Sequence, residues 1–339
     1  MSFSTYEHSS EQRLEEVVDQ FGVVTWRQMA EAGIGGRHVR RLIGNGQLLP
    51  AARGVYRTPA PNEVQGAWRQ RARVALLAAG HGAVLARSSG GVLWDLDGFR
   101  LRSGGRVSAW DRAGDPRSWP IELNIAVAGT RRGPGRRRAV PLEAPDCIDR
   151  LAVTGIGQTL VELGATESPA GLEVTDRVEL ALESALRRPL TTLSEIAELA
   201  DTAASHHGSA TLRRVLARRP TGAAPTESYL ETRTVQLLRR KGFADPERQV
   251  ELFDRHGRIG RFDFLLAAGG IPRSRHGAMV LEVDGRATHD NDPSFVIDRL
   301  RWDRLTALGL RPMVLTYGLV EDEPDLVTTL LRDTLALSG

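Results

Sequence analysis

Apolar residues recur with a helical period in the first sixty residues of the chain. The segment 11–20 has its apolar residues on one face and predicts a helix. Thr25 is placed to cap a second helix, which ends at Gly33. A third predicted helix covers 37–46, and a β-hairpin follows over 47–59. Three short helices followed by a hairpin predict a winged helix-turn-helix, whose last helix enters the major groove of DNA.

Basic residues lie where such a DNA-binding domain would use them. The third predicted helix turns three arginines outward, and the hairpin adds two more. The predicted DNA-binding residues of this segment are Arg37, Arg40, Arg41, Arg53 and Arg57. An alternative is a winged helix used only for protein contacts, with these arginines on a solvated face.

The string GVVTWRQMAEAGI…VRRLIGNGQLLPAARGVYR resembles the N-terminal winged-helix domain of AbiEi-type antitoxins, over about residues 10–60. Those antitoxins belong to type IV toxin–antitoxin systems and are transcriptional autoregulators. The resemblance implies double-stranded DNA as a partner, and a cognate toxin or a second copy of the chain as a further one.

The middle of the chain carries weaker patterns and no catalytic constellation. Its sequence also resembles the continuation found in antitoxin-like proteins. A strand is predicted at 121–127 and an arginine-rich loop or hairpin at 131–138, and the rest is mostly helical. The predicted helices lie at 65–80, 88–98, 157–164, 175–187 and 192–204. A linker rich in Pro, Gly, Ala and Thr over 218–228 marks a domain boundary.

The last part of the chain predicts an α/β domain of order α-β-β-β-α-β-α. Its predicted elements are helices at 226–241, 293–308 and 323–336 and strands at 248–254, 259–267, 278–285 and 311–318. The fold class is therefore α+β and multidomain: a winged helix over 1–60, a mostly helical middle region over 61–220, and a domain with a central mixed sheet over 221–339.

Three acidic residues lie inside predicted strands of the last domain. Asp263 alternates with Phe262 and Phe264, so its side chain is expected to face opposite to both. Glu282 and Asp284 alternate with apolar residues and are expected to share a face. Carboxylates beside an apolar sheet are costly unless a cation compensates, and Mg²⁺ prefers oxygen ligands. The pattern predicts a metal centre suited to phosphodiester hydrolysis.

Five strings of the last domain resemble the PD-(D/E)xK nuclease superfamily, in the branch close to very-short-patch-repair (Vsr) endonucleases. These are TES, GRFDF, LEVDGRATH, DRLRWDRL and a following G-x-x-P strand, and they cover about residues 222–335. The resemblance implies a restriction-endonuclease-like fold and a metal-dependent endodeoxyribonuclease.

By this resemblance Asp263 and Glu282 hold Mg²⁺ or Mn²⁺, and Glu227 reaches the metal directly or through water. His289 orients the attacking water or acts as a base, and Arg299 holds a phosphate or pairs with an acid.

The chain departs from the superfamily pattern at Asp284, where lysine is common, which moves water activation towards His289. Several alternatives stay open. Asp263 and Glu282 could be only surface-facing strand residues paired with arginines. Asp284 could only shape the turn before Gly285, His289 could be a structural histidine, and Glu227 could only favour the start of a helix, with Glu231 as the helix acid instead. The charged residues of the 293–308 helix could only form ion pairs with one another: Asp298, Arg299, Asp303 and Arg304.

Composition narrows the classes of protein. The chain has 339 residues, 41% of them hydrophobic, and a net charge of +3. Cys147 is its only cysteine, which excludes a disulfide framework and a cysteine-rich zinc site. No apolar run is long enough to span a bilayer and no signal peptide is visible, so a cytoplasmic protein without a membrane partner is expected. Lys241 is the only lysine, and arginine suits phosphate binding.

Two functions follow from these patterns. In the first, the winged helix binds duplex DNA and the last domain cuts it with Mg²⁺, in defence, repair or a toxin–antitoxin setting. In the second, the chain is a DNA-binding transcriptional regulator or type IV antitoxin whose last domain is a nuclease-fold scaffold without turnover.

Overall fold

A computed structural model describes residues 10–100, 121–125, 144–166, 173–267, 277–284 and 294–336. It divides into two compact units. Unit 1 comprises 1–171 with 195–210, and unit 2 comprises 172–194 with 211–339. The division at 60 and 220 stays a prediction. No helix in the described part is long and apolar enough to cross a membrane.

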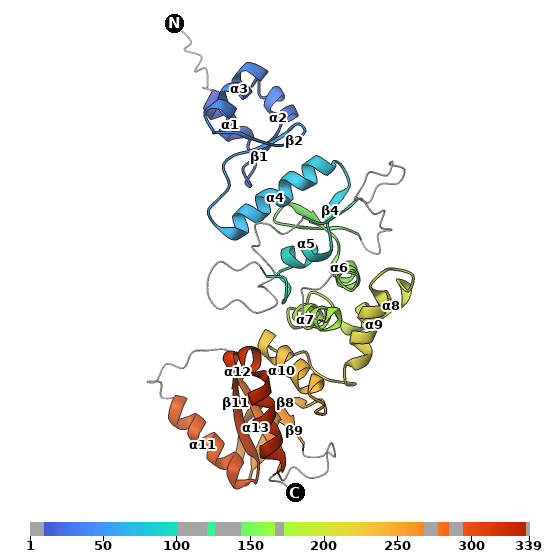
Figure 1. The fold of residues 1–339 in the computed structure, drawn as a ribbon, viewed down its shortest axis with the longest axis vertical. Helices are drawn as coiled ribbons and strands as arrows, with labels where there is room; N and C mark the ends of the chain where they lie inside the picture. The colour runs from blue at the N-terminus through green and yellow to red at the C-terminus, as the bar shows by residue number, and fades with distance from the viewer. Residues whose placement is uncertain are drawn as a thin grey trace. The chain divides into compact units, whose positions relative to one another are not determined.

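Unit 1 begins with the three helices and the hairpin that the sequence predicts (Figure 1). A short strand before the second helix pairs with the hairpin, so the sheet has three strands in the order β1-β3-β2. Its core includes Met29, Leu42 and Leu48, each fully buried. The elements are α1 (Ser10–Val17), β1 (Val23–Thr25), α2 (Trp26–Glu31), α3 (Gly36–Gly44), β2 (Leu49–Ala52) and β3 (Val55–Arg57). The winged-helix prediction is confirmed at the level of the fold.

A long helix, α4 (Val64–Ala79), packs on this sheet and on a second one. The buried amide of Gln70 fixes α4 to the winged helix, because its Nε2 donates to Phe21 O at 3.0 Å and to Thr58 O at 3.3 Å. The second sheet has the order β5-β4-β7-β6. Its strands are β4 (Ala83–Leu85), β5 (Leu123–Ile125), β6 (Asp146–Ile148) and β7 (Leu151–Val153), and the other helices of this unit are α5 (Arg87–Leu93), α6 (Ile156–Leu163) and α8 (Leu193–Thr202).

The middle region is therefore less helical than the sequence predicts. Of the four strands described in this region, three were not expected, because each has only three residues and shows no alternating pattern. The predicted strand at 121–127 is present as Leu123–Ile125. The arginine-rich segment 131–138 lies outside the described residues.

Unit 2 contains a four-stranded mixed sheet in the order β11-β10-β9-β8, with β10 and β11 parallel and the other pairs antiparallel. This confirms the mixed sheet. Its elements are α7 (Val174–Arg187), α9 (Ser209–Arg218), α10 (Tyr229–Arg240), β8 (Glu247–Asp254), β9 (Gly257–Leu266), β10 (Met279–Asp284), α11 (Ser294–Ala307), β11 (Arg311–Thr316), α12 (Tyr317–Asp322) and α13 (Pro324–Ala336). The last strand is shorter than predicted, because Thr316 caps α12.

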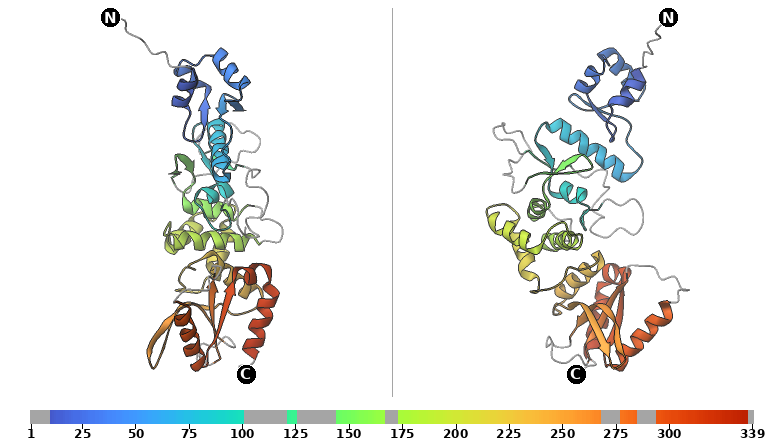
Figure 2. Two further views of the ribbon diagram at one scale, coloured as in Figure 1. Left: turned by 90° about the vertical axis from the view of Figure 1, so that its left-hand side faces the viewer. Right: turned by 180° about the vertical axis from the view of Figure 1, so that it is seen from behind.

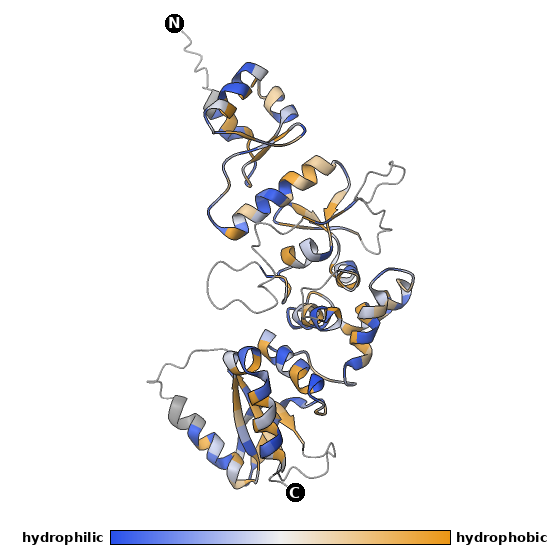
Figure 3. Cartoon of the chain, in the orientation of Figure 1, coloured by the Kyte–Doolittle hydropathy of each residue, from blue (hydrophilic) through white to orange (hydrophobic). Residues whose placement is uncertain are grey.

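Helices cover both faces of this sheet (Figure 2). Side chains of β10 alternate between two cores: Met279 and Leu281 pack with α10, α12 and α13, whereas Val280 packs with Leu305 of α11. Orange, apolar stretches run along strands of this sheet in Figure 3. The carboxyl end of β10, where the pattern turns acidic, is where the candidate centre lies.

Candidate functional site

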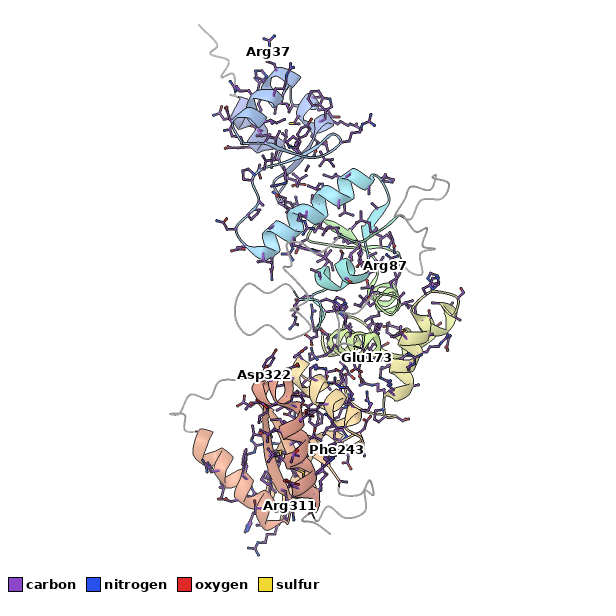
Figure 4. The ribbon with its side chains drawn as sticks, viewed as in Figure 1. Arg37, Arg87, Glu173, Phe243, Arg311 and Asp322 are labelled. Atoms are coloured by element: carbon purple, nitrogen blue, oxygen red, sulfur yellow. The ribbon has the colours of Figure 1, made fainter. Side chains whose placement is uncertain are left out.

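The outer face of α3 is basic. Arg37, Arg40 and Arg41 are exposed, while Val39 and Leu42 are buried on the opposite side. Figure 4 shows Arg37 pointing away from the winged helix. The helix has a strongly amphipathic pattern, and Gly35 caps it without a side-chain hydrogen bond. Exposed arginines on this face are groups of the kind that bind phosphates.

The two hairpin arginines differ in their surroundings. Arg53 is exposed at the turn. The next residue, Gly54, has a φ of 71°, in the left-handed region that favours glycine. Arg57 is half-buried, and its Nη1 donates to Thr58 O at 3.2 Å and to Gln70 Oε1 at 3.3 Å. Arg53 is therefore open to a ligand, whereas Arg57 also fastens the hairpin to α4.

In unit 2, Asp263 lies on β9 beside the carboxyl end of β10. Its Oδ2 accepts the N–H of Val283 at 2.8 Å. The backbone pairing of β9 with β10 extends to Phe264 opposite Leu281, and the bond from Val283 to Asp263 lies just past the end of this pairing. Burial raises the pKa of the Asp263 carboxyl, and the Glu227 carboxylate raises it further. An ionised Asp263 would gain from a nearby cation.

The expectation that Asp263 faces opposite to both flanking phenylalanines was wrong. Phe264 packs with the α10, α12 and α13 core, and Phe262 packs with the α11 core. Alternation is therefore interrupted within 262–264. On the neighbouring strand Gln249, opposite this position in the register, has a left-handed φ of 53°, so β8 is irregular at the same level.

Two carboxylates with different surroundings lie at the start of α10: Glu227 just before the N-cap Ser228, and Glu231 in the first turn. Glu227 is exposed, and its Oε2 pairs with Arg261 Nη2 at 2.7 Å. Glu231 is only 4% exposed, and its Oε2 accepts from Glu227 N at 2.8 Å and from Gln249 Nε2 at 3.0 Å. Burial raises the pKa of Glu231, and Asp263 and Glu227 add to the shift. The structure thus gives Glu231 the inward position, which was the alternative to Glu227.

Glu282 faces α11. Its Oε1 pairs with Arg301 Nη2 at 3.0 Å, and the Arg301 guanidinium lies 4.7 Å from the centre of the Phe262 ring. A side chain at Gly260 would meet this guanidinium at 2.8 Å, so the bare backbone there makes room for it. Sequence reasoning missed Arg301, because nothing in an arginine-rich helix marks which of its arginines faces the sheet.

The remaining predicted site residues are Asp284, His289 and Arg299. Asp284 is half-buried at the end of β10, level with Thr316 of β11. His289 and Gly285 lie outside the described residues, so the role of His289 stays a prediction. Arg299 is exposed on α11.

The alternative of ion pairs confined to α11 fails for Arg304. Its Nη2 lies 2.6 Å from Asp254 Oδ1 on β8, and this hydrogen-bonded guanidinium lowers the pKa of Asp254. Arg304 therefore fastens α11 to the β8–β9 hairpin.

Oxygen donors suited to a hard cation are present at this centre. Asp263 and Glu282 come from adjacent strands, and Glu231 and Gln249 contact each other beside Asp263. Within the described ranges, no group of three His, Cys, Asp or Glu side chains has the arrangement of a metal site. A third protein oxygen would therefore have to come from another residue type or from segments outside those ranges.

Comparison with known proteins bears on the winged helix. Residues 12–59 match the family model described as a transcriptional regulator, AbiEi antitoxin. No curated protein matches the chain. The matched segment coincides with α1 to β3 and leaves the centre in unit 2 without a family assignment.

Proposed function

We propose that the chain is a DNA-binding transcriptional regulator of the AbiEi antitoxin type, whose winged helix reads duplex DNA through α3. The observation that carries the proposal is the exposed basic face of α3, within the segment that matches the regulator family. Exposed Arg53 at the hairpin turn is placed to add a backbone contact. A cognate toxin or a second copy of the chain would be a further partner, as in such systems.

Binding of the full chain to its own promoter DNA tests this proposal. Arg40→Ala should weaken binding and lower the slope of log affinity against log salt by about 1, because each phosphate contact releases roughly one counterion. Arg214→Ala on α9 removes the same charge from an exposed position outside the winged helix and is the matched control. Equal affinities and salt slopes for both variants and the unaltered chain would rule out α3 as the DNA-contacting helix.

We further propose that unit 2 hydrolyses DNA phosphodiester bonds with Mg²⁺ or Mn²⁺. Its support is the pair of half-buried carboxylates, Asp263 and Glu282, on adjacent strands of a mixed sheet. Asp263 is held where burial disfavours its charge, which a cation would compensate. A bound divalent ion would polarise the phosphate and activate water. Asp263 and Glu282 would hold the ion, and Arg301 would orient Glu282.

Supercoiled plasmid with Mg²⁺ or Mn²⁺ tests this second proposal. The full chain should nick or linearise the plasmid, and Asp263→Ala combined with Glu282→Ala should abolish cutting. Glu251→Ala removes an exposed carboxylate of β8 that pairs with Arg258, and it should cut normally. Intact plasmid with every variant, on several types of DNA, would favour a nuclease-fold scaffold without turnover.

A further inference from the structure

Gln249 adopts a backbone conformation that its residue type disfavours. It lies within β8, between the pairs Arg248 with Phe264 and Val250 with Phe262, and its φ is 53°. A left-handed backbone is uncommon for a residue with a side chain, and such positions concentrate at functional sites. Here the conformation places the Gln249 side chain beside the acidic centre.

The two ends of the Gln249 amide have different surroundings. Its Nε2 donates to Glu231 Oε2 at 3.0 Å, and its side chain also hydrogen-bonds to Asp263. Its Oε1 is buried and has no hydrogen-bond partner among the described residues. Burying an amide oxygen without a partner is unfavourable, so the site needs a further donor or a cation at that position.

The electrostatic surroundings favour a cation over a neutral donor. The carboxylates of Glu231 and Asp263 both lie beside the amide and interact with its side chain, so the site is rich in negative charge. Amide carbonyl oxygens are normal ligands of hard divalent ions. A cation bound between Gln249 and Asp263 would satisfy the orphaned oxygen and reduce the repulsion between the carboxylates.

We propose that Gln249 Oε1 is a third protein ligand of the divalent ion bound by Asp263 and Glu282, and that the Gln249 amide N–H holds the two inner carboxylates in place. This inference rests on the metal centre proposed above. It assigns to β8 a neutral oxygen donor beside the two carboxylates. It also accounts for a left-handed residue in the middle of a strand.

The test measures Mn²⁺ binding to the full chain by electron paramagnetic resonance, independently of any cutting. Gln249→Gly accepts the left-handed backbone and removes the side chain, and Gln249→Met keeps a similar size without the oxygen. Both should raise the Kd for Mn²⁺ about tenfold or more, the loss typical when groups supporting a metal are removed. Glu251→Ala, on the same strand, should leave the Kd unchanged.

Gln249→Glu separates a ligand from a merely structural hydrogen-bond donor. It supplies a carboxylate oxygen but no N–H, so a ligand role predicts Mn²⁺ binding at least as tight as in the unaltered chain. A structural role predicts weakening equal to that of Gln249→Met. Weakening by Gln249→Glu as large as that by Gln249→Met, or unchanged Mn²⁺ binding in Gln249→Gly, would overturn the inference. The effect of Asp263→Ala on Mn²⁺ binding would still test the metal centre by itself. Absence of Mn²⁺ binding by the unaltered chain would overturn the metal centre and the inference together.

Discussion

The carboxyl of Glu231 lies where its charge is disfavoured. It is 4% exposed, burial raises its pKa, and the Asp263 and Glu227 carboxylates raise it further. A carboxyl whose pKa is raised by folding contributes most stability when protonated, and that contribution is lost as pH rises through the folded-state pKa. A protein that keeps such a carboxyl is less stable at neutral pH than it would be with a neutral side chain there. Such a loss of stability is common where function requires the group.

We therefore expect Glu231→Gln to stabilise the chain. The amide is uncharged and its oxygen can still accept the N–H bonds of Glu227 and Gln249. With a chelator present at pH 7.5, the free energy of unfolding should rise by about 1 kcal/mol, the usual size of a single stabilising substitution. At pH 4, below the raised pKa, the gain should shrink because the unaltered carboxyl is protonated. Denaturant titrations at both pH values measure this.

The matched control is Glu251→Gln, which neutralises an exposed carboxylate on β8. It should change the unfolding free energy little at either pH. If Glu231→Gln destabilised the chain at pH 7.5, the charge of Glu231 would be favourable as it stands, and the argument from burial would fail.

At the scale of the element, the helix-turn-helix depends on how α2 begins. Thr25 caps α2 in a reciprocal capping box: its Oγ1 accepts from Gln28 N at 3.3 Å, and Gln28 Oε1 accepts from Thr25 N at 2.9 Å. Thr25 is also the last residue of β1, paired with Val55 of the hairpin. One residue thus sets the start of α2 relative to the sheet of the winged helix.

Thr25→Ala should cost about 1 kcal/mol of stability, because it leaves the N–H of Gln28 without its acceptor. Thr25→Ser keeps the hydroxyl and should retain most of the stability. Circular dichroism melts of the full chain compare the two, with promoter binding as a second measurement. Equal melting temperatures for the alanine and serine variants would show that the capping hydroxyl contributes little.

The elements that sequence could predict are those with local signals. The cap at Thr25, the glycine at Gly54 and the amphipathic α3 are visible in the sequence, and the winged helix follows from them. Strands of three residues, such as Ala83–Leu85, are too short for an alternating pattern to appear. Their pairing depends on contacts with distant segments, which no local pattern encodes.

In the candidate centre too, some residues could be predicted from the sequence and others could not. Asp263 and Glu282 stand out as acids within apolar strands. The inward position of Glu231 depends on the start of α10 at Tyr229, three residues later than the predicted start at 226. Arg301 and Gln249 become visible only when α11 and β8 are placed against β9. Sequence reasoning therefore predicted the acids of the centre, while their neutral and cationic neighbours required the tertiary structure.

At the scale of the whole molecule, α7 belongs to unit 2 although it precedes the predicted linker at 218–228. It packs on α10 through charged side chains that are mostly buried. Glu179 Oε1 lies 3.0 Å from Arg239 Nη1, and Glu183 Oε1 lies 3.1 Å from Arg248 Nη1. Glu183 also accepts the N–H of Thr226 at 2.9 Å. Within 221–339 Arg239 keeps one carboxylate partner, Asp245 at 3.2 Å, whereas the Glu183 partner of Arg248 lies on α7.

A fragment over 173–339 should therefore fold more stably than one over 221–339. The shorter fragment leaves Arg239 and Arg248 without their α7 partners, and removing one partner of a buried ion pair typically costs about 3–5 kcal/mol. Differential scanning calorimetry of the two fragments measures the difference. Glu183→Gln in the longer fragment removes one carboxylate while keeping the helix, and should reproduce part of the loss. If both fragments melted at the same temperature, the ion pairs would be dispensable and α7 would act as a connecting helix, with the boundary of the folded domain at the linker after all.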